Sequence, residues 1–369
     1  MTQSEETTVS QFKCPSCGGN SVFDPEVGQL RCPFCDTEIE IARTTKQNVE
    51  LDFLQALQVE DEEWAPGLRV FHCDNCGAET VLSEHTVADF CSFCGSSHIE
   101  QTDHNTGIRP ALVVPFQVSH QQAIDAFKKW IKARYMAPGK LRTMHQLDRL
   151  TGIYIPYWTY DTDTYSTYTV KVGIHYYVQE TYTTTDSNGN TVTQTRMVQK
   201  TRWHFENGTH REFFDDVLIR ATNQANGHLI KKIEPFGLQQ LVDYNDAYLS
   251  GFIAERYAVP LENGWHLAKS KVDQGIESSI ESKTAGDIVI VMQCDTDYND
   301  ITYKHLLLPI WISSFRYNGK VYPFIINGQS GRVAGESPVS WVKVTCIVVL
   351  SIAFIAFLYF GFLSDNPIF

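Results

Sequence analysis

The amino-acid sequence predicts an α+β protein with a cysteine-rich N-terminal part, a β-rich middle and one apolar helix near its C-terminal end. Three observations predict this class. Four Cys-x-x-Cys pairs occur before residue 95, Thr, Tyr and Val alternate along residues 152–185 and 191–205, and residues 344–363 carry no charge. The length of 369 residues allows two or three folded units.

Eight of the ten cysteines form two tandem units of equal spacing. In each unit 14 residues separate the first pair from the second, so residues 13–36 and 72–95 are two copies of one unit. Two such pairs supply the four sulfur ligands of a tetrahedral zinc site. We therefore expect two zinc ribbons, at residues 1–45 and 69–107, each holding one structural Zn²⁺. The expected ligands are Cys14, Cys17, Cys32 and Cys35 in the first ribbon and Cys73, Cys76, Cys91 and Cys94 in the second.

Four thiolate ligands leave no position for a metal-bound water, so the expected role of the metal is folding and not hydrolysis. Iron is an alternative metal, because it also fits four thiolates. A redox dithiol is a competing interpretation, but thioredoxin-like chemistry uses a single pair in a βαβ setting. Gly18, Gly19 and Gly77 follow the first pairs, where a chain that folds around a metal favours positive φ.

Residues 46–68 are predicted to form a linker with a short helix, because Leu51, Leu54 and Leu57, with Phe53 as a further candidate, follow helical spacing. Residues 108–340 are predicted to form one β-rich α+β domain. Its first strand, at residues 111–118, leads into a helix that Ser119 and Gln122 begin with a capping box. The other expected elements are a long hairpin of residues 152–185 and 191–205, a helix over residues 265–282, and strands at residues 287–294, 306–317 and 320–327.

Two segments of this domain resemble each other. Residues 154–158 read YIPYW and residues 307–311 read LLPIW, so each places a proline two residues before a tryptophan. Two interpretations are open. The segments are either a duplicated β-unit or two buried edge strands, where the missing N–H of proline is tolerated.

Residues 341–363 are predicted to cross a membrane. The uncharged stretch of 20 residues spans roughly 30 Å as a helix, which is the thickness of a bilayer core. Lys320, Arg332 and Lys343 precede the stretch and Asp365 follows it, so the positive-inside rule places residues 1–340 in the cytoplasm. We therefore expect a single-pass protein of the cell membrane, with residues 364–369 as a short external tail. The N-terminal residues do not read as a signal peptide, which agrees with a reducing compartment.

The net charge of −13 lies in the first 110 residues, which contain 19 Asp or Glu and 6 Lys or Arg, whereas the rest of the chain contains 24 of each. Affinity for nucleic acid depends largely on Lys and Arg, so the charge disfavours that partner and favours proteins with a basic or apolar surface. The candidate motifs of an enzyme or a calcium site are also incomplete. Residues 327–331 lack the spacing of a nucleophile elbow, and residues 295–306 lack the Gly and Glu of a calcium loop, so we expect no enzymatic activity.

The assembled pattern resembles a known bacterial family. It consists of CPSC…CPFC and CDNC…CSFC, then LVVPFQVS, GIYIPYW, LLLPIWISSFRYNGKVYPFIINGQSGRVAGE and a terminal apolar helix. The family comprises membrane-anchored twin zinc-ribbon proteins, labelled TFIIB-type zinc ribbon or primosomal replication factor Y-like, one of which is encoded beside phage-shock protein A in bacilli. The number of membrane anchors differs among its members.

The resemblance implies a membrane platform that recruits soluble proteins, among them a band-7 or virion-core-like protein and phage-shock protein A, in an envelope-stress response. Sequence and resemblance together predict a membrane-tethered zinc-ribbon scaffold that recruits cytoplasmic partner proteins. The alternative is a membrane-tethered nucleic-acid-binding protein of the replication or helicase-associated type, which the replication label implies and the acidic N-terminal part opposes.

Overall fold

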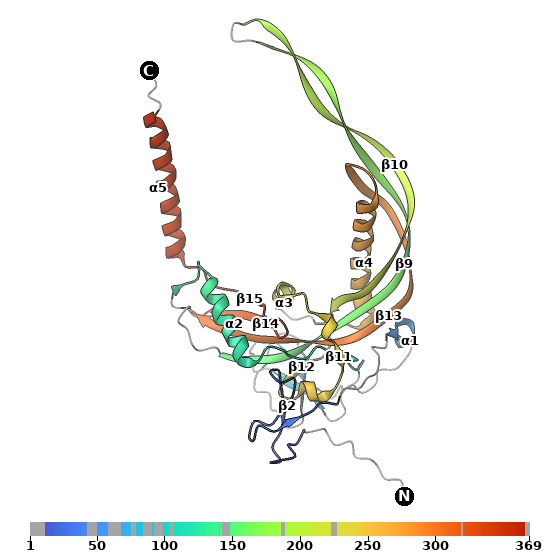
Figure 1. The fold of residues 1–369 in the computed structure, drawn as a ribbon, viewed down its shortest axis with the longest axis vertical. Helices are drawn as coiled ribbons and strands as arrows, with labels where there is room; N and C mark the ends of the chain where they lie inside the picture. Colours follow the sequence, from blue (N-terminus) through green and yellow to red (C-terminus); the bar gives the residue numbers. More distant parts are fainter. Residues whose placement is uncertain are drawn as a thin grey trace.

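The computed structural model describes residues 12–42, 50–57, 68–74, 79–83, 91, 99–102, 107–139, 141, 148–185, 189–222, 227–318 and 320–365. In these residues a three-stranded sheet lies near the N-terminus, a mixed twelve-stranded sheet forms the body, and a long helix stands apart from both (Figure 1). The prediction of a β-rich α+β protein with few helices and one C-terminal apolar helix is confirmed.

The first cysteine unit forms the small antiparallel sheet of β1 (Val22–Asp24), β2 (Gln29–Arg31) and β3 (Glu38–Ile39). It is packed against the body, because Phe23 lies with its ring edge on Tyr248 of the short helix η3 (Asp246–Leu249). The backbone N–H of Phe23 also donates to the carbonyl of Ser250 at 2.9 Å. The first cysteine unit is therefore a docked part of the molecule.

The second cysteine unit is built into the large sheet. Its strands are β5 (Leu68–Cys73), β6 (Glu79–Ser83) and β7 (Ile99–Thr102), and β6 pairs with β12 (Ile253–Glu255) of the body. The backbone N–H of Arg256 continues this pairing by donating to the carbonyl of Glu79 at 3.0 Å. The domain boundary that the sequence predicts near residue 107 therefore falls between strands of one continuous sheet.

The predicted linker helix is a single turn. The described part of the linker begins with β4 (Leu51–Asp52), which pairs with the body, and continues into α1 (Phe53–Ala56). Asp52 caps this helix, because its side chain accepts a hydrogen bond from the N–H of Gln55 at 2.7 Å. Phe53 is buried, whereas Leu54 and Leu57 are exposed. Of the residues that follow helical spacing only Phe53 is therefore buried, and residues 43–49 and 58–67 lie outside the described part of the chain.

Three very long strands form the centre of the body. They are β9 (Asp148–Thr185), β10 (Thr191–Arg220) and β13 (Ile288–Tyr317), with β14 (Lys320–Asn327) and β15 (Val333–Gly335) alongside. The predicted hairpin is confirmed, since β9 and β10 pair from Thr185 and Thr191 to Tyr157 and Arg220. Pairing of β9 with β13 ends at Gly173, so the rest of the hairpin extends from the body as a curved two-stranded arm (Figure 1).

Helices cover the long strands. The capping box of α2 (His120–Ala133) is confirmed, because Ser119 and Gln122 exchange side-chain and backbone hydrogen bonds. The second predicted helix is α4 (Leu261–Lys283). The predicted strand at residues 111–118 is shorter than expected, with β8 limited to Leu112–Val113. The remaining short elements are α3 (Gly227–Ile233), η2 (Leu238–Gln240) and β11 (Val242–Asp243).

The two Pro-Trp segments pair with each other. β9 and β13 run antiparallel, with Ile155 opposite Leu308 and Tyr154 opposite Pro309. A local two-fold axis through the first of these pairs therefore relates the segments. Each is flanked by a further strand, since β12 pairs with β9 at Tyr154 and β8 pairs with β13 at Leu307. The interpretation as two edge strands is therefore wrong.

The same axis relates the surrounding elements. Each short strand, β8 or β12, pairs in parallel with the long strand that belongs to the other copy, and each leads into a helix, α2 or α4. The proline carbonyls accept equivalent bonds, from the N–H of Ala221 to Pro156 at 3.0 Å and from the N–H of Gly328 to Pro309 at 2.9 Å. Because proline donates no hydrogen bond, the neighbouring strand changes there, to β10 along β9 and to β14 along β13.

The tryptophans make matching contacts as well. Trp158 Nε1 donates to the carbonyl of Val259 and Trp311 Nε1 donates to the carbonyl of Val118, each at 2.9 Å. Each acceptor lies two residues before the first residue of a helix, α4 or α2. These equivalent contacts favour a duplicated β-unit whose two copies exchange their short strands.

The duplication predicts equal effects at two distant positions. Trp158→Phe and Trp311→Phe each remove one buried indole bond and leave a carbonyl without its donor, so each is expected to lower the free energy of unfolding by about 1–3 kcal/mol. Urea unfolding of the detergent-solubilised chain, followed by far-UV circular dichroism, measures the loss. Trp203→Phe, at a partly exposed position at the base of the arm, is the matched control, and a loss confined to one of the two core variants would contradict the equivalence.

The last helix, α5 (Trp341–Asp365), is apolar and exposed. It is long and apolar enough to cross a membrane between Trp341 and Tyr359, and no part of that stretch is buried in the protein. In Figure 1 it leaves the body on the side opposite β2, so the first cysteine unit and the apolar helix lie at opposite ends of the body.

Candidate metal centre

The four cysteines of the first unit lie together. The sulfurs of Cys14, Cys17, Cys32 and Cys35 are all within 4.8 Å of one another. Cys14 Sγ is 3.4 Å from Cys35 Sγ, and Cys17 Sγ is 3.4 Å from Cys32 Sγ. The sulfur ligands of one tetrahedral zinc ion stand roughly 3.8 Å apart. The spacing therefore fits a single ion, and the cluster could hold a metal.

Two equivalent turns position these sulfurs. The N–H of Gly18 donates to the carbonyl of Cys14, and the N–H of Asp36 donates to the carbonyl of Cys32, each at 2.9 Å. Both donors have positive φ, 74° at Gly18 and 57° at Asp36. The expected positive φ is thus observed at Gly18 but not at Gly19. Asp36 takes the place of Gly18 in the second turn, because Asp tolerates this region better than most residues.

The surroundings shift the thiol pKa values in opposite directions. Burial raises the pKa of Cys14, but hydrogen bonds from the backbone of Cys17 and Ser16 outweigh it and lower the pKa to about 6. The backbone of Gly19 lowers the pKa of Cys17, but the thiols of Cys35 and Cys32 outweigh it and raise the pKa to about 12. Four thiolates this close repel one another, and a divalent cation among them removes that conflict.

The second set of predicted ligands is described in part. Cys73 ends β5 and is buried, and Cys91 is also buried. Cys76 and Cys94, together with Gly77, lie outside the described residues. The two cysteines that the sequence leaves out of the ribbons are in different surroundings, with Cys294 half-buried on β13 and Cys346 exposed on α5.

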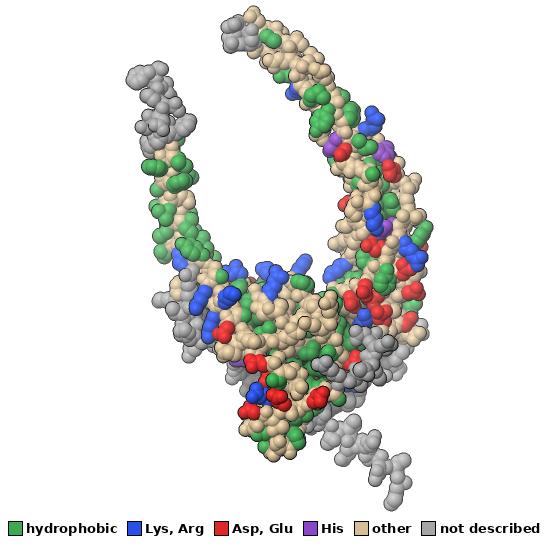
Figure 2. All heavy atoms as spheres, viewed as in Figure 1, with side chains coloured by type: hydrophobic (Ala, Val, Ile, Leu, Met, Phe, Trp, Pro, Cys, Tyr) green, Lys and Arg blue, Asp and Glu red, His purple; other side chains and the backbone are tan. Residues whose placement is uncertain are grey.

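Charge is unevenly distributed over the surface. In the view of Figure 2, Lys and Arg side chains line the upper surface of the body between α5 and α4, and Asp and Glu side chains lie over its lower and right-hand parts. The net charge of −13 therefore conceals a basic surface on the side where α5 leaves the body.

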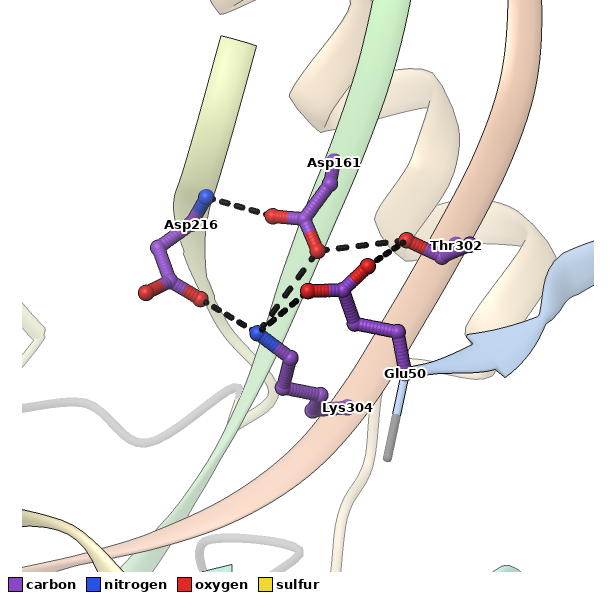
Figure 3. Close-up of polar contacts among 5 residues, drawn as sticks. All are labelled: Glu50, Asp161, Asp216, Thr302 and Lys304. Atoms are coloured by element: carbon purple, nitrogen blue, oxygen red, sulfur yellow. Dashed lines mark hydrogen bonds and ion pairs between the residues drawn. The ribbon is translucent and has the colours of Figure 1, made fainter. Parts of the chain in front are cut away.

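A second polar cluster was not predicted. Lys304 Nζ lies 3.1 Å from Asp216 Oδ1, 3.6 Å from Asp161 Oδ2 and 3.4 Å from Glu50 Oε1 (Figure 3). The Thr302 hydroxyl donates to Asp161 at 3.1 Å. Only 8% of the Lys304 side chain and 1% of the Asp161 side chain are exposed. The cluster ties β4, β9, β10 and β13 together.

A bulge of β10 creates this cluster. Asp215 and Asp216 interrupt the pairing between Phe214 and Val217, and the N–H of Asp216, at φ 51°, donates to Asp161 Oδ1 at 2.5 Å. Oxygens of Asp161, Asp215 and Asp216 lie close enough to hold a cation. The Lys304 ammonium already lies among them and serves as the internal counter-ion.

Electrostatics support this role. Burial lowers the pKa of Lys304, but the hydrogen bond to Asp216 and the charge of Asp161 outweigh it, so the net shift is upward and the charged form is favoured. Burial and the charges of Asp216 and Asp161 raise the pKa of Asp215. The available sequence signal was the charged Asp161 and Lys304 within aromatic and apolar stretches. Residues 295–306, considered as a calcium loop, lie within β13.

One relative spans nearly the whole chain. Over 344 residues the chain is 31% identical to a Bacillus subtilis (strain 168) protein with the printed name "Uncharacterized protein YdjG", and the alignment covers 91% of this chain and 92% of that protein. No family model matches the chain. No solved structure matches it either.

Proposed function

This chain belongs to the protein family of YdjG from Bacillus subtilis, and we propose that it is a membrane-tethered zinc-ribbon scaffold that recruits cytoplasmic proteins to the membrane in an envelope-stress response. α5 is the tether, and the acidic ribbons are the surface that partners bind. The observation that carries the proposal is the placement of the apolar helix and the cysteine cluster at opposite ends of the body. A tether at one end leaves the other end open to soluble proteins.

We propose zinc as the metal of both units. The first site offers four sulfurs at tetrahedral spacing and no other ligand type, which suits zinc and excludes a preference for Mg²⁺ or Ca²⁺. The second unit repeats the spacing of the first, and its described cysteines, Cys73 and Cys91, are buried. Metal analysis of the purified chain tests this, with two zinc ions per chain as the expected content.

The arm limits how α5 enters a bilayer. The arm and α5 extend to the same side of the body (Figure 1). Among the described strands β10 pairs only with β9, so its outer edge has no strand partner, and lipid cannot satisfy exposed N–H and C=O groups. We propose that the arm stays in the cytoplasm and bends away from the bilayer, because the bonds of Ser340 and Lys343 to residues 135–137 hold the base of α5 against the body.

The tether itself has a direct test. Leu350→Arg combined with Phe354→Arg places two charges near the middle of α5, at a cost of about 2.5–3.5 kcal/mol each in a membrane helix. We expect the double variant to move from the membrane fraction to the soluble fraction after flotation of cell lysates. Val321→Arg combined with Val339→Arg adds the same charge at two exposed positions outside residues 341–363 and should stay in membranes. Wild-type chain that leaves membranes with salt alone would contradict the tether.

Recruitment is tested by affinity purification of the detergent-solubilised chain, with nuclease treatment in parallel. We expect protein partners that persist after nuclease and that are lost when Cys32→Ser disrupts the first site. Partners that disappear with nuclease would instead favour the nucleic-acid-binding alternative, because the ribbons would then contact proteins only through DNA or RNA.

A further inference from the structure

The end of α2 is fixed at the point where α5 leaves the body. The N–H of Ser340 donates to the carbonyl of Met136 at 2.8 Å. Lys343 Nζ donates to the carbonyls of Tyr135 at 2.9 Å and Ala137 at 2.7 Å. These bonds join two segments about 200 residues apart in sequence, so any membrane that takes up α5 comes close to residues 134–137.

Large side chains are exposed at this junction. Tyr135 is 70% exposed, Trp341 79% and Val342 75%, and Met136 is partly exposed. Tyr and Trp concentrate at the boundary between lipid and water, where an aromatic ring meets both apolar and polar surroundings. The exposed rings lie beside the start of an apolar helix, so they occupy the depth at which such a boundary would fall.

Cations surround these rings. Lys132 and Arg134 are exposed at the end of α2, and the Arg134 guanidinium lies over the Trp130 ring at 4.7 Å. Lys343 lies over the Tyr135 ring at 5.6 Å. The acidic residue of α2, Asp125, is more than one turn earlier and is paired with Lys128 at 3.6 Å. The end of α2 is therefore a basic surface, and Figure 2 shows Lys and Arg side chains gathered beside the base of α5.

We infer that residues 132–137, together with Trp341 and Lys343, form a collar that binds the anionic headgroups of the bilayer around α5. The inference rests on the proposed tether and adds a second, headgroup-specific contact to it. Aromatic and aliphatic exposure next to a membrane-type helix favours lipid, because a contact with nucleic-acid phosphates would require the cations but not the exposed Tyr135, Met136 and Trp341.

The test uses the full chain in two kinds of nanodisc, one of phosphatidylcholine alone and one that also contains phosphatidylglycerol. Hydrogen–deuterium exchange is followed for the amides of residues 128–139. In the anionic nanodiscs we expect exchange to slow by at least about tenfold relative to the neutral ones, because Lys132 and Arg134 near an anionic surface each contribute on the order of a fivefold factor. Lys132→Glu combined with Arg134→Glu should abolish the difference.

Lys269→Glu combined with Lys283→Glu is the matched control, since both lysines are exposed on α4 and the change in charge is the same. This variant should keep the tenfold difference, and unchanged exchange in β9 and β13 shows that both variants are folded. Equal exchange in the two nanodiscs, or a difference that survives the α2 double variant, would overturn the collar. Slowing by duplex DNA in place of phosphatidylglycerol would also overturn it. A chain that enters neither nanodisc would overturn the tether, and the collar with it.

Discussion

Cys32→Ser is expected to remove one zinc ion per chain and to unfold the first ribbon. Cys32 is fully buried, and its sulfur is one of four that lie within 4.8 Å of one another. Structural zinc contributes about 10–16 kcal/mol in isolated zinc-finger peptides, so losing one ligand removes most of what holds so small a sheet together. Metal analysis should fall from two zinc ions per chain to one, and limited proteolysis should cut within residues 12–42.

The body should remain folded in the Cys32→Ser variant. β1 to β3 form their own sheet, and Phe23, Leu30 and Ile41 share one buried cluster with the body, whereas the large sheet has a second cluster that the first cysteine unit does not enter. Unfolding of the ribbon exposes Tyr248 and Phe252, so a change in near-UV circular dichroism is expected with little change in the far-UV signal. Cys346→Ser, an exposed thiol on α5, is the matched control and should keep both ions. Full zinc content in Cys32→Ser would contradict the four-cysteine site.

Lys304→Ala is expected to destabilise the body by about 3–5 kcal/mol. Removing one member of a buried ion pair leaves the other charge buried without compensation. Here the stranded charge is that of Asp161, which is 1% exposed, with Asp216 beside it. Urea unfolding of the detergent-solubilised chain measures the loss. Lys304→Met combined with Asp161→Leu should recover part of it, because two apolar groups leave fewer unpaired charges.

A surface pair supplies the control for Lys304. Arg211 on β10 pairs with Asp163 on β9, but the Arg211 side chain is 74% exposed, so Arg211→Ala should cost at most about 1 kcal/mol. The folded-state pKa of Lys304 is raised, so the stabilisation is complete below the unfolded pKa of about 10.4 and is lost only as the pH rises through the higher folded value. The loss in Lys304→Ala should therefore be the same at pH 7 and pH 9. If Lys304→Ala lowers the free energy of unfolding by less than about 1 kcal/mol, the Lys304 cluster does not stabilise the packing of these strands.

Local signals predicted the elements whose causes are local. The capping box at Ser119 and Gln122 lies within one helical turn, and each Cys-x-x-Cys pair lies within one tight turn. The long hairpin follows from alternation over residues 152–185 and 191–205, on the two sides of a short polar turn. These features depend on neighbours a few residues apart, so one sequence was enough to identify them.

The other features of the fold depend on strand register and on which strands pair with each other. The helical spacing of residues 51–57 did not show which side chain is buried, because pairing of β4 with β13 places Phe53 against Trp265. The Pro-Trp repeat was visible, but whether it marked edges or a duplication depended on Ile155 facing Leu308. The sequence could not show which strands lie side by side, since pairing energies per residue are small and similar for many registers.

The sequence alone determined that this protein has clustered cysteine ligands, a β-rich body and an apolar helix, because composition and short-range spacing determine which residues can bind a metal, alternate in a strand or enter lipid. Only the tertiary structure decided that the second cysteine unit continues the main sheet, that Lys304 lies among Asp161, Asp216 and Glu50, and that the end of α2 meets the base of α5. These contacts join segments more than 85 residues apart. They form only when packing of the whole body selects one register among many.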